Sequence, residues 1–192
     1  EFYEFSTVDR FLSWGWSDDL KKVVVPTCVQ SPQEKFSPKK AGGLLVVLGP
    51  VTRNSDVYQM LGAQSNSSYL DYLNKLINLL PEDILKKTEV RPKNASAKGK
   101  PARVSALQVA ELLDNLIEID TGGLSLSEKQ SQNRLSIVTY NETTIPTNLL
   151  VGYPTVALWD PKYVRLVSSA KNIYGSLLTA KILHHSPESA AQ

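Results

Sequence analysis

Short apolar segments that alternate with longer helical patterns are the feature that most limits how this chain can fold. The segments rich in Val, Ile and Leu span 10–16, 21–26, 43–50, 88–92, 116–120, 135–140 and 155–160. They have the length of strands, and most are apolar throughout instead of alternating between apolar and polar residues. Strands that are apolar on both faces are typical of a parallel sheet covered by helices on both sides. The pattern therefore predicts an open α/β fold with a mainly parallel sheet.

The helical patterns between these segments give a second set of expectations. They cover 65–87, 105–116, 142–152, 161–183 and the chain from 186 onward. Pro81 should break the first of them, because proline removes a backbone donor. Gly152 should stop the third, and Gly175 should divide the fourth into a helix pair. Ser186 should cap the last, with proline at the first helical position.

The composition argues against several classes of function. The net charge is only +2, and basic residues are scattered apart from the loop 91–103, so we expect no nucleic-acid partner. A single cysteine, Cys28, excludes an intrachain disulfide and a cysteine-based zinc site. The two histidines, His184 and His185, are adjacent, and we expect no metal. No apolar run has the length of about 18 residues that a membrane span needs.

The segment 26–42 contains three prolines and few large apolar residues, which is typical of a linker. We therefore expect three parts: the end of a preceding domain or an interdomain segment at 1–25, the linker at 26–42, and the main α/β domain at 43–192. The chain begins at Glu1, directly before an aromatic segment. We expect that a preceding domain carries part of the function.

The most informative polar cluster follows the segment around Ile137 and Val138. Ligands of open parallel sheets bind beyond the carboxyl ends of the strands, where the strand order reverses. Backbone N–H groups at a helix start, with nearby hydroxyl and amide groups, suit a phosphate. The residues that could form such a site are Tyr140, Asn141, Thr143 and Thr144. The alternative is that Asn141 or a threonine is only a helix N-cap.

Other segments also end in polar residues. Arg91 ends the segment 88–92 and could bind phosphate through its planar guanidinium, or lie in a solvated basic loop. Thr52 and Arg53 follow the segment 43–50, again at a carboxyl end. The chain contains neither GxGxxG nor GxxxxGK[ST], so no dinucleotide or P-loop fingerprint is present.

Tryptophans mark two further candidates. Trp14 and Trp16 flank Gly15 and could stack on a sugar or a base, or fill an apolar seam. Trp159 and Asp160 end the segment 155–160, where Asp160 could accept hydrogen bonds from ligand hydroxyls or cap the helix that follows. No Ser-His-Asp or Cys-His set is recognisable, and the catalytic residues remain unidentified.

The order of these motifs resembles a known family. The segments FLSWGWSDD, LLVVLGPVTR, EVRP, NLIEID, SIVTYNETTIPTNLLVGYPTVALWDPKYVRL and ILHHSPESAAQ resemble the carboxy-terminal portion of a bacterial family of surface-carbohydrate-biosynthesis transferases. The resemblance is densest from Ser136 to Leu166, with T-Y-N-x-T, a helix, a Pro-Thr strand start and W-[DN]-P. The chain departs from the family at Val90-Arg91-Pro92, where a longer R-L-[YH]-P-like stretch is usual, and at Asn148, where Glu is common.

The resemblance implies a relationship to GT-B glycosyltransferases and to polyol-phosphate transferases. These have two Rossmann-like domains, and the activated donor is held mainly by the second, which would correspond to 43–192. It implies that Trp14 to Trp16 lie near the interdomain cleft and Arg91 at a phosphate or carboxylate. The residues implied at the donor phosphates are Tyr140, Asn141, Thr143 and Thr144.

These observations lead to one hypothesis and two alternatives. We expect the donor-binding half of a GT-B-like, metal-independent glycosyltransferase, with a nucleotide-sugar donor, a glycan or lipid-linked acceptor, and no cofactor. A missing N-terminal domain would supply the base, and the chain alone would be inactive. We expect a cytoplasmic location, with peripheral association at the inner face of the membrane as a variant. The alternatives are a nucleotide-sugar epimerase of the same fold and a non-catalytic nucleotide- or glycan-binding domain.

Overall fold

The computed structural model describes residues 7–12, 23–24, 38–49, 66–93, 109, 113, 117–164 and 166–192. The chain divides into two compact units, Glu1–Glu34 and Lys35–Gln192. In the first unit, strand β1 (Phe11–Leu12) pairs in parallel with β2 (Val23–Val24). The expected boundaries at 25 and 42 stay a prediction.

The second unit is built on a six-stranded sheet in which every pairing is parallel. In spatial order its strands are β5 (Glu118–Ile119), β4 (Thr88–Arg91), β3 (Leu44–Val47), β6 (Leu135–Val138), β7 (Thr155–Leu158) and β8 (Leu183–His184). The chain runs outward from β3 to β5 and then returns to β6 on the other side of β3. This order is Rossmann-like and confirms the predicted α/β fold, with the reversal between β3 and β6.

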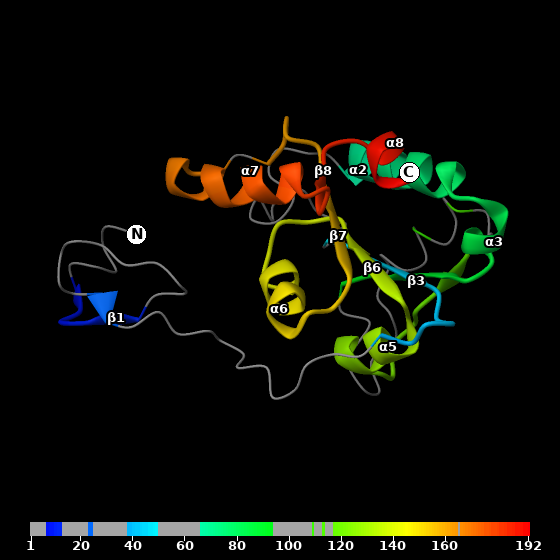
Figure 1. Cartoon of the computed structure of the whole chain (residues 1–192), viewed down its shortest axis with the longest axis horizontal. Coiled ribbons are helices and arrows are strands. Elements are labelled where there is room, and N and C mark those ends of the chain that lie inside the picture. The colour runs from blue at the N-terminus through cyan, green and yellow to red at the C-terminus, as the bar shows by residue number, and fades with distance from the viewer. Residues whose placement is uncertain are drawn as a thin grey trace. The chain divides into compact units, whose positions relative to one another are not determined.

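Helices cover both faces of the sheet, as the continuous apolar strands predict. Leu44, Val46 and Leu48 belong to one core, which contains residues of helix α2 (Asn66–Leu79) and is contacted by Ala190 of α8 (Pro187–Ala190). Leu45 and Val47 belong to a second core with residues of α6 (Thr144–Val151) and α7 (Lys171–Thr179). Figure 1 shows α2 and α8 on one side of the strands and α5 (Leu126–Gln132) and α6 on the other.

The entry into β3 depends on glycine. A Cβ atom on Gly43 would lie 1.8 Å from the carbonyl oxygen of Lys87, which is inside van der Waals contact. The close approach allows the Leu44 amide to donate to that same carbonyl over 3.0 Å. Gly43 therefore fixes how β3 lies against β4, and with it the position of both carboxyl ends.

Most helix boundaries follow the sequence signals. Pro81 separates α2 from α3 (Glu82–Leu85), and Gly152 ends α6 with a φ of 72°. Ser186 caps α8 by accepting a hydrogen bond from the Ser189 amide. These three predictions are confirmed.

The helix pair predicted over 161–183 is wrong. Residues 161–163 form turns, a short 3-10 helix η1 (Ser168–Ala170) follows, and α7 continues through Gly175 without a break. Gly175 is tolerated because one glycine in a helix costs only about 1 kcal/mol relative to alanine. The segment then ends in β8, which the sequence pattern did not predict.

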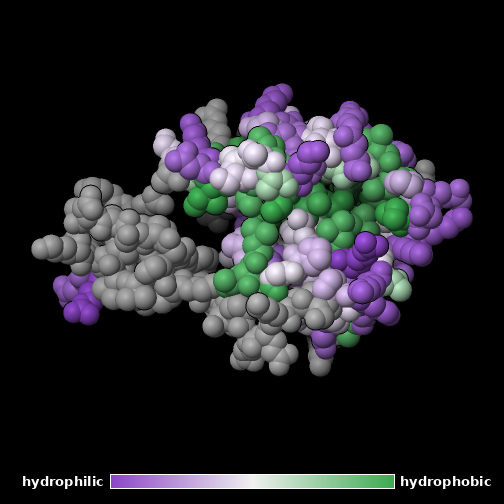
Figure 2. Space-filling model, in the orientation of Figure 1, coloured by the Kyte–Doolittle hydropathy of each residue, from purple (hydrophilic) through white to green (hydrophobic). Residues whose placement is uncertain are grey.

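The surface of the second unit is mixed. Figure 2 shows hydrophobic side chains reaching the surface between hydrophilic ones. The large apolar side chains exposed in this unit lie on several elements: Leu79, Ile84, Leu149, Leu150, Val167, Ile173 and Leu178. Among the described residues, no helix has both the length and the apolar character to span a bilayer.

Candidate functional site

The reversal of strand order places the candidate site at the carboxyl edge of the sheet, where the strands end. In open parallel sheets the crevice between the two strands at the reversal is the usual ligand position. Here those strands are β3, followed by Leu48 and Gly49, and β6, followed by the turn 139–143. The predicted polar cluster therefore begins at one of the two strands that flank the reversal.

Hydrogen bonds of the Tyr69 and Thr139 side chains link the carboxyl ends of the neighbouring strands β3 and β6. The Thr139 hydroxyl donates to the Val47 carbonyl oxygen over 3.1 Å. The Tyr69 hydroxyl therefore donates to Thr139 and accepts from the Gly49 amide, which lies 3.0 Å away. Burial raises the pKa of Tyr69 to about 12, so the phenol remains protonated at neutral pH. The Gly49 amide already donates to Tyr69 and is not a free donor. The candidate donors to a ligand at the reversal therefore follow β6.

Two of the predicted residues, Tyr140 and Thr144, are buried and hydrogen-bonded to each other. Their hydroxyl oxygens lie 2.5 Å apart. Burial raises the pKa of Tyr140, and the hydrogen bond to Thr144 and the nearby charge of Arg91 only partly offset this. The pair fixes the direction in which helix α6 leaves the strand.

Asn141 is held from the other side by helix α7. Its Oδ1 atom accepts a hydrogen bond from the Tyr174 hydroxyl, and the Tyr174 ring meets the ring of Trp159 edge-on, with centroids 5.6 Å apart. An amide whose oxygen is occupied in this way keeps its two N–H donors. Asn141 can therefore donate to an anion while Tyr174 holds it in place.

Thr143 is the N-cap of α6, but its side chain makes no capping hydrogen bond. The alternative is that Asn141 or a threonine caps the helix with its side chain. The Asn141 oxygen instead accepts from Tyr174, and Thr143 makes no side-chain cap. No described residue accepts a hydrogen bond from the Thr143 or Thr144 backbone amide. The exposed Thr143 hydroxyl and the Thr143 and Thr144 amides could therefore face an anionic ligand, whereas the Ile145 amide is bonded to the Glu142 carbonyl and Pro146 has no N–H.

Arg91 ends β4, as the sequence predicted, and its guanidinium is occupied by groups of the protein. Its guanidinium forms an ion pair with Asp120 at the end of β5 and donates to the Leu124 carbonyl oxygen over 2.9 Å. The side chains of Arg91 and Asp120 are 5% and 2% exposed. Arg91 therefore joins the ends of β4 and β5 and is not presented to solvent, and phosphate binding by it stays a prediction without a supporting contact.

Trp159 and Asp160 follow β7 at the same edge. Trp159 is 3% exposed and belongs to the core beneath α6 and α7. Asp160 closes a turn: its Oδ1 accepts from the Lys162 amide over 2.8 Å and its carbonyl oxygen accepts from Tyr163. Thr52, Arg53 and the Trp14 to Trp16 segment lie outside the described residues.

Sequence reasoning missed the residues that hold the turn in place. Lys93 was considered only as a member of a basic loop, yet its Nζ lies 3.0 Å from Glu142 Oε2 and 5.9 Å from the centre of the Tyr140 ring. Tyr69 and Tyr174 are aromatic positions of helical patterns, and nothing in their spacing separates a hydroxyl with a partner from an ordinary core ring. The sequence did offer one signal: Glu142 is an acidic residue within the polar cluster 139–144, and an acidic residue there indicates a cationic partner.

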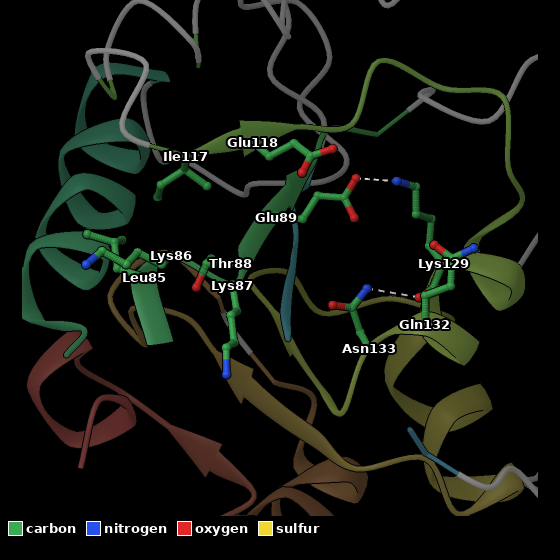
Figure 3. Close-up of a pocket in the computed structure, with 10 residues that line it drawn as sticks. All are labelled: Leu85, Lys86, Lys87, Thr88, Glu89, Ile117, Glu118, Lys129, Gln132 and Asn133. Carbon is green, nitrogen blue, oxygen red and sulfur yellow. Dashed lines mark hydrogen bonds and ion pairs between the residues drawn. The ribbon is translucent and has the colours of Figure 1, made fainter. Parts of the chain in front are cut away.

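A hollow lies at the opposite, amino edge of the sheet (Figure 3). It has a volume of about 290 Å³ and is lined by the starts of β4 and β5 and by the end of α5. Lys129 reaches across the hollow to form an ion pair with Glu89, so these two charges neutralise each other. Neither here nor elsewhere in the described part of the chain do three or more His, Cys, Asp or Glu side chains gather as a metal site would require.

The fold and the carboxyl edge define a Rossmann-like α/β protein with a polar turn at the reversal of strand order. The chain matches the model of the LIC12162 family transferase over residues 1–192. The chain belongs to this family, and the transferase class that the sequence predicted is supported. No curated protein and no solved structure matches the chain.

Proposed function

We propose that this chain is the donor-binding part of a GT-B-like transferase. It would hold the diphosphate of a nucleotide-activated sugar, or of a related phosphate-activated group, for transfer to a cell-surface glycan. The observation that carries the proposal is the position of the Tyr140–Thr144 turn: it follows β6, a strand that flanks the reversal of strand order, and it opens helix α6. Membership of a transferase family supports the reaction class.

The chemistry of the turn suits a leaving diphosphate. Negative charge builds up on the diphosphate as the sugar departs, and fixed N–H donors stabilise it without reorganisation. The Thr143 and Thr144 backbone amides, the Thr143 hydroxyl and the Asn141 side-chain amide would supply these donors. Tyr140 and Thr144 are bonded to each other and act by positioning.

Activation of the acceptor hydroxyl requires a general base, which we assign to a part of the protein outside the second unit. A glycan or lipid-linked acceptor and a cytoplasmic location at the inner face of the membrane complete the proposal. Both rest on the resemblance of the motifs to surface-carbohydrate-biosynthesis transferases.

A thermal-shift panel tests the proposal. The panel contains nucleotide-sugars with different bases, the matching nucleoside diphosphates, and the matching free sugars and nucleosides without phosphate. A ligand that binds only the folded state raises the unfolding midpoint, by about 2.7 kcal/mol of stability at a hundredfold excess over its Kd. We expect at least one nucleotide-sugar and its diphosphate to shift the midpoint while the phosphate-free compounds do not. A flat panel would contradict the proposal.

A further inference from the structure

The ion pair of Lys93 and Glu142 joins two strand ends that are not neighbours. Lys93 follows β4 and Glu142 follows β6, and β3 lies between these strands. The pair, with 3.0 Å between Nζ and Oε2, therefore bridges the carboxyl end of β3 at the reversal of strand order. The lysine also lies 5.9 Å from the centre of the Tyr140 ring.

The carboxylate of Glu142 occupies a position that favours any anion. Glu142 directly precedes Thr143, the N-cap of α6, and its carbonyl oxygen accepts from the Ile145 amide. The start of a helix carries a partial positive charge, and here a lysine ammonium group adds a full one. Glu142 places an internal negative charge where these two positive charges meet.

The exposure of the pair allows the carboxylate to be exchanged. The side chains of Lys93 and Glu142 are 28% and 25% exposed, so both groups retain contact with water. An ion pair in such a position contributes little to stability and is easily replaced. A diphosphate carries more charge than one carboxylate and has more oxygen atoms with which to bond both Lys93 and the Thr143 and Thr144 amides.

We infer that Glu142 is an internal substitute for the donor phosphate: it holds Lys93 in the ligand-free protein and is displaced when a diphosphate binds. This inference rests on the proposed function and adds two residues to it. Lys93 is the cation that contacts the diphosphate, and Glu142 sets the affinity by competing for the same lysine. The competition weakens every anion, and a diphosphate overcomes it more readily than a monophosphate because it has more charge and more oxygen atoms with which to bind.

The test is a calorimetric titration of the 192-residue chain and its Lys93→Met and Glu142→Gln variants. The probes are inorganic phosphate, inorganic pyrophosphate and UDP. We expect Lys93→Met to weaken pyrophosphate and UDP about tenfold, the effect of one charge-assisted contact. Glu142→Gln should tighten both by about threefold or more, because the competitor is lost and the amide preserves the shape. A gain in affinity cannot result from damage to the fold.

The matched control is the ion pair of Lys86 and Glu82 at the other end of β4. Lys86 Nζ lies 2.6 Å from Glu82 Oε1, and the two residues are the C-cap and the first residue of helix α3. Lys86→Met and Glu82→Gln change the same charges and should leave every affinity unchanged. If UDP binds the wild-type chain and neither Lys93→Met nor Glu142→Gln alters its affinity, the inference is overturned while the proposed donor site stands. If no phosphate probe binds the wild type or Glu142→Gln and no nucleotide-sugar shifts the melting midpoint, both are overturned.

Discussion

Two strand-to-helix corners of the same sheet edge are built in opposite ways. At the β5–α5 corner, Arg91 and Asp120 are paired and buried, and Ser125 and Glu128 form a capping box that satisfies the start of the helix. At the β6–α6 corner, Lys93 and Glu142 are paired but remain partly in water, and Thr143 makes no side-chain cap. The first corner has a buried ion pair and a side-chain cap, whereas the second has a partly exposed ion pair and no side-chain cap.

The difference follows from burial. Removing one partner of a buried ion pair leaves a charge without solvent or counter-ion, which costs several kcal/mol. An exposed pair is screened by water and contributes between about 0 and 1 kcal/mol. A site that must exchange an internal partner for a ligand needs the second arrangement, so we assign structure to Arg91 and binding to the turn after β6.

The largest expected effect concerns the β5–α5 corner, with its buried ion pair. Arg91→Leu should lower the free energy of unfolding by about 3 kcal/mol, since buried Asp120 would lose its nearest cation and keep the Gly122 amide and Lys129 at 4.0 Å. Urea unfolding followed by circular dichroism measures the change. The control, Lys93→Leu, should cost no more than about 1 kcal/mol because its pair is partly exposed. Equal losses in the two variants would show that the corners do not differ as described.

The next effect concerns Tyr69, which holds the ends of β3 and β6 together. Burial raises its pKa from 10.0 to about 12, so the neutral phenol is favoured in the folded state. Its contribution is therefore complete below pH 10 and is lost as the pH rises toward 12, by about 1.4 kcal/mol for each unit of pKa difference.

Urea unfolding at pH 9 and pH 12 compares the wild type with Tyr69→Phe. The variant should lose less stability over this interval by about 2 to 3 kcal/mol, whatever its stability at neutral pH. If both proteins lose the same amount, the Tyr69 hydroxyl is not buried and hydrogen-bonded with Thr139 and Gly49.

The smallest stability effect compares the two helix starts. Ser125→Ala removes a side chain that accepts from the Glu128 amide, and it should cost about 1 kcal/mol. Thr143→Ala removes a hydroxyl that caps nothing and should change the free energy of unfolding by less than about 0.5 kcal/mol. Thermal denaturation of the two variants provides the measurement, and a larger loss for Thr143→Ala would reveal a structural role for that hydroxyl.

The main features of the fold could be predicted because they depend on local pattern. The strands of the second unit from β3 to β7 were expected from short apolar segments, and the end of α6 at Gly152 from glycine. Helix α5 was missed although Ser125 and Glu128 carry a capping-box signature, because its residues are mostly polar. Strand β8 (Leu183–His184) was missed because its first residue falls at the end of the apolar pattern over 161–183, which is typical of a helix.

The position of the candidate site could be predicted from the sequence, but the ion pairs around it could not. The turn at Tyr140 to Thr144 was expected from polar residues after an apolar strand. The partners of Arg91 and Lys93 were not, because they lie 29 and 49 residues further along the chain. Which carboxylate meets which cation depends on the order of strands in the sheet, and local sequence carries no information on that order.

The most direct test of the donor site is a calorimetric titration of UDP or GDP, whichever shifts the melting midpoint, into the wild type and Thr143→Ala. Thr179→Ala, which removes an exposed hydroxyl from the far end of α7, is the control. Loss of one hydrogen bond to a phosphate should weaken binding by about threefold to tenfold in Thr143→Ala while Thr179→Ala binds as the wild type does. Unchanged affinity in Thr143→Ala would contradict the claim that this turn holds the donor diphosphate.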